Sequence, residues 1–461
     1  MIRYISTRGA SPPLGFFDVV LTGLAPDGGL YVPETLSRFS ASEIAEFGTL
    51  DYVTLAQRIL APFVGGELSE AQLRQMLEET YASFRHTAIA PLVQVGHHQF
   101  ILELFHGATL AFKDFALQFL GRLLDHILRQ RGERATVIGA TSGDTGSAAI
   151  AACAGRDALR LFILHPHGRV SEVQRRQMTT VADANVHNLA VQGTFDDCQD
   201  IVKTLFGDAA FRESERLVAV NSINWARICA QVVYYFYAAC ALGAPHRRVS
   251  FSVPTGNFGD IYAGYIAKRL GLPVERLVIA TNRNDILTRC LNTGAYAMES
   301  VSPSLSPSMD IQISSNFERL LFDLHGRNGK GLAAAMQRFR AEKRLALEPD
   351  ALQTLRQEFS AQAVDDAQTL STIAEVYAQT GYLADPHTAV GLAAAFAHAE
   401  PGIPMITLAT AHPAKFPEAV ERATGVRPAL PPHMRDLFEK KERYEVVENN
   451  AEIIKAYIAQ T

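Results

Sequence analysis

From Val93 onward, short apolar runs alternate with longer segments whose apolar residues recur at helical spacing. The short runs predict strands, and the periodic segments between them predict helices. The predicted strands are 99–104, 135–140, 159–164, 186–191, 251–253, 277–280 and 405–408. The predicted helices are 115–132, 145–154, 171–181, 196–206, 224–242 and 261–270. This order predicts an α/β fold with parallel sheets covered by helices, and ligands beyond the carboxyl ends of the strands.

The first ninety or so residues follow a different pattern and predict a separate unit. Short apolar runs and turns precede two helical segments, of which the second begins with a capping-box pattern at Ser69 and ends near Phe84. Further along, residues Thr293 to Asp310 are rich in Ser, Pro and Gly and predict a long loop, our candidate for a lid. A mainly helical stretch is expected from 317 to about 380.

Length and charge narrow the functional classes. A chain of 461 residues predicts about three ordinary domains or two large ones. Its net charge of −5 argues against broad binding to nucleic acid or anionic membranes. The longest apolar stretch, Ile228 to Ala244, is interrupted by Gln231 and is shorter than the roughly 20 residues of a membrane span. We expect a buried helix there.

The cysteines and histidines suggest neither disulfides nor a metal site. The five cysteines show no C-x-x-C pairing, which favours buried thiols in a reduced, cytoplasmic protein. His165 and His167 flank a proline, with no third ligand in a recognisable pattern, so we expect a turn and no metal.

The turn from Val253 to Asp260 carries the strongest chemical signal. Two glycines and an asparagine between a strand and a helix leave backbone N–H groups free, and the helix dipole adds positive charge, which suits a phosphate. The turn lacks the Gly-Lys-Ser/Thr end of a P-loop and the third glycine of a dinucleotide fingerprint. The phosphate therefore belongs to something other than a nucleotide, although a plain loop is the alternative for such a turn taken alone.

Two further segments strengthen this interpretation. Lys113 follows Phe112 near a helix start, where burial would lower its pKa and make it a nucleophilic amine; the alternative is a lysine with its head in water. Thr141 to Ser147 combines hydroxyls and glycines after a strand and suits a carboxylate; the alternative is an ordinary capped helix. An amine, a carboxylate loop and a phosphate socket together indicate pyridoxal 5'-phosphate.

At this point the chain resembles a known family, the threonine synthases, in its longer bacterial and fungal branch. The matching segments appear in the family's order and are Tyr4–Gly9, Asp27–Pro33, His106–Asp114, Ala140–Ser147, Asn221–Arg227, Pro254–Asp260, Ser308–Ile311 and Thr410–Phe416. The combination is far more specific than any one motif. The resemblance implies the type II pyridoxal-phosphate fold, like that of the tryptophan synthase β chain. It also implies an N-terminal domain at 1–92 and a catalytic region at 93–461, with a small subdomain of about 93–210 beside a large one of about 211–461.

The resemblance also implies roles for individual residues. Lys113 would be the Schiff-base lysine, and Thr410 would hydrogen-bond the pyridine nitrogen. The phosphate-binding residues would be Gly256, Asn257, Phe258, Gly259 and Asp260. The substrate carboxylate would be held by Ser142, Gly143, Asp144 and Thr145. Candidates for the substrate phosphate are Arg227, Ser314, Ser315, Asn316 and Lys415.

The implied reaction is the conversion of O-phospho-L-homoserine and water into L-threonine and phosphate, by γ-elimination and β-replacement with Lys113 as the main proton shuttle. A threonine or serine dehydratase of the same fold is the nearest rival, and a non-catalytic relative is the rival from another class. The segments Tyr4–Gly9 and Asp27–Pro33 disfavour the dehydratase, and the presence of Lys113 disfavours a non-catalytic protein. We expect a monomer or a homodimer.

Overall fold

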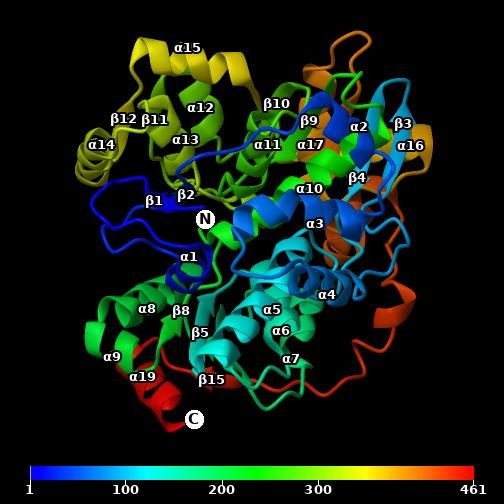
Figure 1. Cartoon of the computed structure of the whole chain (residues 1–461). Coiled ribbons are helices and arrows are strands. Elements are labelled where there is room, and N and C mark those ends of the chain that lie inside the picture. The colour runs from blue at the N-terminus through cyan, green and yellow to red at the C-terminus, as the bar shows by residue number, and fades with distance from the viewer. Residues whose placement is uncertain (1) are drawn as a thin grey trace.

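A computed structural model describes residues 2–461 and contains two parallel sheets, one in each half of the molecule (Figure 1). The larger sheet is parallel except for its edge strand β3, which runs antiparallel to β4. Its strands, in spatial order, are β13 (Phe359–Ala363), β10 (Val274–Thr281), β9 (Val249–Pro254), β14 (Met405–Ala409), β4 (Gln99–Glu103) and β3 (Leu92–Gly96).

The smaller sheet is parallel throughout. Its strands, in spatial order, are β15 (Glu445–Val447), β7 (Val186–Val191), β6 (Leu159–Pro166), β5 (Ala135–Ala140) and β8 (Leu217–Val218). Two antiparallel pairs complete the strands: β1 (Tyr4–Ser6) with β2 (Tyr31–Pro33), and β11 (Ala295–Ala297) with β12 (Arg344–Ala346). Together with the helices, these sheets confirm the predicted α/β class.

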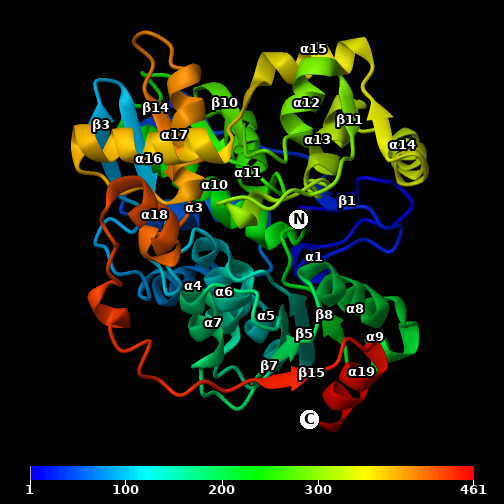
Figure 2. The same ribbon diagram turned by 180° about the vertical axis from the view of Figure 1, so that it is seen from behind.

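Helices lie between most consecutive strands and cover both sheets (Figures 1 and 2). In the first half of the chain they are α1 (Phe16–Thr22), α2 (Ala41–Phe47), α3 (Tyr52–Val64), α4 (Glu70–Tyr81), α5 (Lys113–Arg131), α6 (Asp144–Cys153), α7 (Glu172–Thr179), α8 (Phe195–Gly207), α9 (Ala209–Ser214) and α10 (Trp225–Ala241). The others are α11 (Gly259–Arg269), α12 (Ile286–Thr293), α13 (Phe317–Leu324), α14 (Gly329–Glu342), α15 (Pro349–Glu358), α16 (Asp366–Thr380), α17 (Pro386–Ala397), α18 (Pro417–Thr424) and α19 (Ala451–Gln460). Short 3₁₀ turns are η1 (Pro307–Met309), η2 (Pro413–Lys415) and η3 (Pro432–Met434).

Helix α10 is the buried apolar helix expected between 224 and 242. Most of its residues are buried, including Trp225, and its apolar surface contacts α5, α11 and the N-terminal helix α3. None of the helices within residues 2–461 is long and apolar enough to cross a membrane.

The N-terminal residues do not form a core of their own. The rings of Tyr4 and Phe63 lie 5.9 Å from that of Trp225, and the Tyr4 hydroxyl donates a 2.6 Å hydrogen bond to the Phe63 carbonyl. The same hydrophobic cluster continues into α5. Because burying apolar surface stabilises whichever elements share it, the first ninety residues support the catalytic region directly.

Several local predictions were wrong. The N-terminal region forms α1 to α4, not two helical segments. The stretch from 317 to 380 is mainly helical as predicted, with the short strands β12 and β13 between its helices. Strand β13 is short and lies at a sheet edge beside β10, so its apolar pattern was hidden among helical segments. The loop expected at 293–310 contains β11 and η1.

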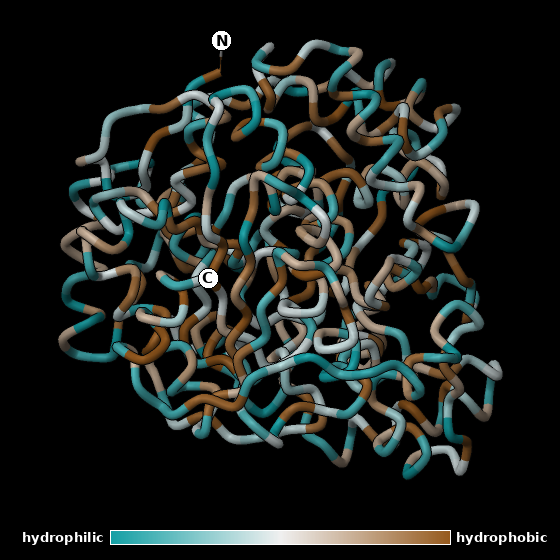
Figure 3. Tube along the Cα trace, turned by 90° about the horizontal axis from the view of Figure 1, so that it is seen from below, coloured by the Kyte–Doolittle hydropathy of each residue, from teal (hydrophilic) through white to brown (hydrophobic). Residues whose placement is uncertain are grey.

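The sheets also divide differently from the subdomains predicted at 93–210 and 211–461. Strands β3 and β4 belong to the larger sheet, because β4 pairs with β14 near the middle of that sheet. Strand β15 and helix α19 pack on the smaller sheet, after the C-terminal chain has run along the outside of the molecule (Figure 2). Hydrophilic chain lies around much of the periphery (Figure 3).

Candidate active site

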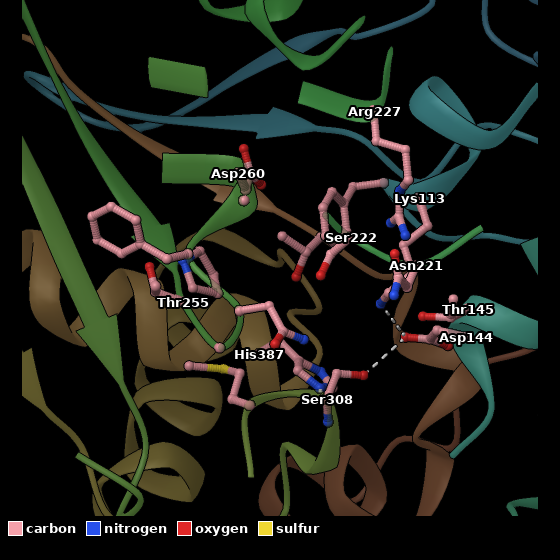
Figure 4. A pocket seen from close by; sticks show the side chains of 18 of the residues that line it. Lys113, Asp144, Thr145, Asn221, Ser222, Arg227, Thr255, Asp260, Ser308 and His387 are labelled. Atoms are coloured by element: carbon pink, nitrogen blue, oxygen red, sulfur yellow. Dashed lines mark hydrogen bonds and ion pairs between the residues drawn. The ribbon is translucent and has the colours of Figure 1, made fainter. Parts of the chain in front are cut away.

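A cavity of about 200 Å³ opens where strands of both sheets end at their carboxyl edges (Figure 4). The smaller sheet contributes Asp144 and Thr145 after β5, and the larger sheet contributes the turn after β9 and Thr410 after β14. Lys113 enters from the start of α5. Such an edge is where α/β proteins bind ligands.

The turn between β9 and α11 has the features of a phosphate cradle. Within residues 2–461, the backbone N–H groups of Gly256, Asn257 and Phe258 form no hydrogen bond. Phe258 adopts the left-handed region, with a φ of 64°, and no side chain caps the helix that follows. A Cβ on Gly256 would lie 2.9 Å from the carbonyl oxygen of Ser308, so the turn needs glycine there. These free donors at a helix start fit the phosphate of pyridoxal phosphate.

Lys113 is held in place by the turn that precedes it. The Asp114 carboxylate accepts hydrogen bonds from the backbone N–H and the hydroxyl of Thr109, at 2.7 and 2.8 Å. Leu110 takes up the left-handed region with a φ of 62°, which brings Lys113 to the first position of α5. Burial lowers the pKa of the Lys113 amine, and although the Asp144 carboxylate opposes this, nearby cations lower it further. The lowered pKa suits a nucleophilic amine.

Asp144 is the centre of a buried charge cluster. Its carboxylate lies 2.7 Å from the Lys415 ammonium and 3.3 Å from the Lys113 Nζ. The Gln174 amide donates to it at 2.8 Å and the Ser308 hydroxyl at 3.3 Å. Burial alone would raise the pKa of this carboxyl, but Lys415 and Lys113 hold that pKa well below its usual range. The cluster therefore keeps Asp144 ionised beside the reactive amine.

Arg227 is a buried cation without a carboxylate partner within residues 2–461. Its Nη1 donates to the Val220 carbonyl at 3.1 Å, and its Nε has no partner. Burial lowers the pKa of this guanidinium to about 10. Asn221 and Ser222 line the same cavity (Figure 4). An unpaired buried cation beside polar side chains favours an anionic ligand.

Comparison with known proteins decides the family. Three family models cover most of the chain: "Threonine synthase N terminus" at residues 3–81, "Pyridoxal-phosphate dependent enzyme" at 87–351 and "Threonine synthase, C-terminal" at 388–458. The threonine synthase of Pseudomonas aeruginosa is 59% identical, over 100% of this chain and 98% of its own length. The chain belongs to the threonine synthase family. It is a pyridoxal-phosphate-dependent enzyme with the type II fold.

Solved structures of the family agree with this assignment. The structure of PLP-bound threonine synthase from Brucella melitensis has a TM-score of 0.98 and 53% identity, and covers 100% of this chain and 99% of that chain. The yeast threonine synthase structure has a TM-score of 0.95 and 40% identity, and covers 99% and 98% of the two chains.

Some of the site residues predicted from the sequence do not line the cavity. Lys113, Asp144, Thr145, Arg227, Thr410 and residues 256–260 line it, whereas Ser142, Gly143 and Lys415 are absent from its described lining. The Thr141 side chain folds forward over the turn after β5, and its hydroxyl oxygen accepts hydrogen bonds from the N–H groups of Gly143 and Gly146 at 2.9 Å each. Lys415 instead pairs with Asp144 and donates to the Thr109 carbonyl at 2.8 Å.

The residues 314–316 lie behind the phosphate cradle and do not line the described cavity. The Ser314 hydroxyl donates to the Gly256 carbonyl, and the Asn316 amide donates to the Asn257 carbonyl at 3.0 Å. These contacts give the carbonyls of Gly256 and Asn257 partners, whereas the N–H groups of residues 256–258 have none within residues 2–461. Ser314 and Asn316 thus bond to the backbone of the cradle, and the contact of this segment with substrate phosphate stays a prediction.

Asp260 and Thr410 face the cavity with free polar atoms. The hydroxyls of Tyr234 and Tyr235 donate to Asp260 Oδ1 at 2.5 and 2.9 Å, while Oδ2 is buried without a partner in the described chain. Burial raises the pKa of this carboxyl to about 6. The Thr410 carbonyl accepts from the Phe112 N–H at 2.9 Å. That contact fixes the strand end that carries the Thr410 side chain.

Sequence reasoning missed His387 and did not single out Ser308 for a contact. His387 is 3% exposed, lines the cavity and begins α17 after Asp385. The Asp-Pro pair before it is a helix-start signal that could have placed this histidine at a helix N-terminus. Nothing in the local sequence shows that α17 starts beside the cavity, because the contact joins residues far apart in the chain.

Proposed function

We propose that this chain converts O-phospho-L-homoserine and water into L-threonine and phosphate. The observation that carries the proposal is that two separate sets of groups suited to an anion line one cavity. The N–H groups of residues 256–258 suit the cofactor phosphate, and Arg227, with Asn221 and Ser222, suits a second phosphate on the substrate. A dehydratase acting on threonine or serine has no substrate phosphate and needs no such cation.

The cofactor, when bound, withdraws electrons from the substrate and acidifies the protons on its α- and β-carbons. Lys113 would hold the cofactor through its amine, and the same amine, when free, is placed to take the α-proton. Asp144 holds that amine in position at 3.3 Å. Thr410 offers the ring nitrogen a neutral hydroxyl, which cannot keep the ring protonated as a carboxylate would.

The remaining groups act on the substrate. Arg227 binds the γ-phosphate and stabilises the charge that phosphate gains as it leaves. The start of α6, with Thr145 at the cavity, holds the substrate carboxylate. The charge of Asp144 does not oppose this carboxylate strongly, because Lys415 and Lys113 balance it. Water then adds at the β-carbon.

The test is to incubate the pyridoxal-phosphate-loaded protein with O-phospho-L-homoserine and to quantify phosphate and L-threonine. We expect equal amounts of the two, and no 2-oxo acid from L-threonine or L-serine. Arg227→Gln should lower kcat/KM about 100-fold, the equivalent of about 2.7 kcal/mol. The matched control is Arg248→Gln, because the Arg248 side chain is 69% exposed and is absent from the described lining of the cavity. Formation of 2-oxo acid without threonine would indicate the dehydratase instead.

The proposal also covers the N-terminal domain, a lid over the cavity, and the location and oligomeric state of the enzyme. The first ninety or so residues act as an N-terminal domain that buttresses the catalytic region through α3 and α10. The segment Thr293–Asp310 is the proposed lid, since Ser308 and Met309 already line the cavity. We further propose a cytoplasmic enzyme, monomeric or homodimeric, that does not bind nucleic acid; its net charge of −5 supports the last point.

A further inference from the structure

The proposed reaction moves protons at three carbons of the substrate, and Lys113 is the one lysine that lines the described cavity. In the overall change the α-carbon loses and regains a proton, the β-carbon loses a proton, and the γ-carbon gains one. Lys113 is placed for the α-carbon. A second group that can take a proton at the β-carbon and return one at the γ-carbon would complete the sequence.

Five titratable side chains line the described cavity: Lys113, Asp144, Arg227, Asp260 and His387. Arg227 is a cation and is no base. Asp144 is a weak base, because two lysines hold its pKa well below the usual range. Asp260 directly follows the phosphate cradle, where a bound phosphate dianion disfavours a second negative charge. His387 is the remaining candidate.

The surroundings of His387 give its ring one defined orientation. Nδ1 lies 2.7 Å from Asp385 Oδ2, so the carboxylate accepts a hydrogen bond from Nδ1 and leaves Nε2 as the proton acceptor. Asp385 is itself fixed, because it accepts from the backbone N–H groups of His387 and Thr388 at 3.0 Å each. A carboxylate that orients an imidazole in this way is the arrangement of an activated general base.

His387 lines the cavity near Ser308 (Figure 4), and its ring atom next to the Ser308 backbone is Nε2. The Ser308 N–H donates to it at 3.3 Å, which is longer than a normal hydrogen bond of about 2.7–3.2 Å. The lone pair is therefore held only loosely and can accept a proton from a bound molecule. The Ser308 hydroxyl reaches Asp144 at 3.3 Å, so Ser308 joins the histidine to the lysine cluster.

We propose that His387, oriented by Asp385, is the second proton carrier of the reaction and serves the β- and γ-carbons. This inference rests on the proposed function. Nε2 takes the β-proton while the β-carbon's C–H electron pair forms a bond to the γ-carbon. The bond from the γ-carbon to oxygen breaks, and its electrons leave with phosphate. The imidazolium then delivers its proton to the γ-carbon, where the electron pair of the β–γ double bond forms the new C–H bond. The pair left at the α-carbon after Lys113 has removed the α-proton forms an α–β double bond, to which water adds. The γ-carbon becomes the methyl group, and the ring returns to neutral imidazole.

The test separates the two carbons with a phosphonate analogue of the substrate, in which a methylene replaces the ester oxygen so that phosphate cannot leave. Exchange of α- and β-protons in D₂O is followed by proton NMR on the loaded enzyme. In His387→Asn we expect β-exchange to slow about 100-fold or more, with α-exchange within about threefold of wild type. Asp385→Asn should slow β-exchange about tenfold, and imidazole should restore part of it in His387→Ala.

The matched control is His398→Asn, because His398 lies just after the C-terminal end of α17. This substitution should change neither exchange rate. Cofactor absorbance and the urea midpoint of each variant show whether it is folded and loaded. If His387→Asn keeps β-exchange, or loses α- and β-exchange equally, the proposal is overturned. If the wild type forms no threonine from O-phospho-L-homoserine, the proposed function fails, and this inference fails with it.

Discussion

Two turns of the molecule look alike in sequence and differ in what they leave free. Each is glycine-rich, follows a parallel strand, precedes a helix and begins with a threonine: Thr141 after β5 and Thr255 after β9. The Thr141 hydroxyl oxygen accepts from the N–H groups of Gly143 and Gly146. The Thr255 hydroxyl instead donates backward to the Val253 carbonyl at 2.6 Å.

This one difference separates two functions. Where the threonine folds forward, it uses the N–H groups of the turn, which then presents a side chain, Asp144, to the lysines. Where it folds back, the N–H groups of residues 256–258 remain free for an anion. The two carboxyls at the helix starts also differ: the pKa of Asp144 is well below its usual range, whereas burial raises that of Asp260 to about 6.

The largest effect is expected from removing the amine that Asp144 holds. Lys113→Ala should lower turnover by about 10⁴-fold, because it removes both the attachment point and the α-carbon base. Borohydride reduction followed by peptide mass spectrometry should label Lys113 in the wild type and nothing in the variant. Since the second turn is intact, the variant should still bind cofactor reversibly. Lys203→Ala, at a side chain that is 72% exposed, is the control; full turnover in Lys113→Ala would disprove the assignment.

The carboxyl after the second turn should make stability depend on pH. A pKa of about 6 in the folded protein, against 3.8 ordinarily, means that the folded state keeps a proton which the unfolded chain has lost. The apoprotein should therefore lose up to about 3 kcal/mol of unfolding free energy as the pH rises from about 4 through 6. Asp260→Asn should flatten that part of the profile in urea titrations. Parallel profiles for the two proteins would argue against a buried, proton-holding Asp260.

A side chain added to the second turn should weaken the binding of the cofactor and leave the fold intact. In Gly256→Ala the new Cβ would meet the Ser308 carbonyl oxygen at 2.9 Å, so the cradle must move. We expect the Kd for pyridoxal phosphate, measured by absorbance titration, to rise about 100-fold, or about 2.7 kcal/mol. Gly207→Ala is a suitable control, because no atom lies within 4 Å of its added Cβ. An unchanged Kd would mean that the phosphate binds elsewhere.

The equivalent substitution in the first turn should lower the stability of the fold more than the affinity for the cofactor. Gly143 has a φ of 146°, and its added Cβ would lie 2.5 Å from the Gln174 side chain. We expect Gly143→Ala to lower the free energy of unfolding by about 2 kcal/mol, measured in urea, while the cofactor Kd changes less than about tenfold. If Gly143→Ala raises the cofactor Kd as much as Gly256→Ala does, the two turns do not have the separate functions described here.

The sequence predicted the elements whose signals are local. The alternation of apolar runs predicted β4, β5, β7 and β14 to within one residue at each end, and it located β6 and β9 with shorter bounds. The glycines at 256 and 259 indicated the cradle because their turn chemistry is short-range. The apolar neighbours of Lys113 likewise indicated its burial. Edge strands such as β13 were missed, since only pairing with β10 makes them strands.

Contacts between distant parts of the chain were beyond sequence reasoning. Lys415 is a candidate for the substrate phosphate, and nothing in its local sequence predicts that its ammonium lies 2.7 Å from Asp144, which is far earlier in the chain. His387 gave no sign of lying at the cavity, and residues 314–316 gave none of lying behind it. In each case a polar side chain has several possible partners, and only the packing of the two sheets selects one.

The most direct test of the account is a crystal structure of the protein with pyridoxal phosphate bound. We predict the cofactor phosphate at the turn after β9, about 3 Å from the N–H groups of residues 256–258, with the ring joined to Lys113. A phosphate at the start of α6, beside Gly143 and Asp144, would contradict the account.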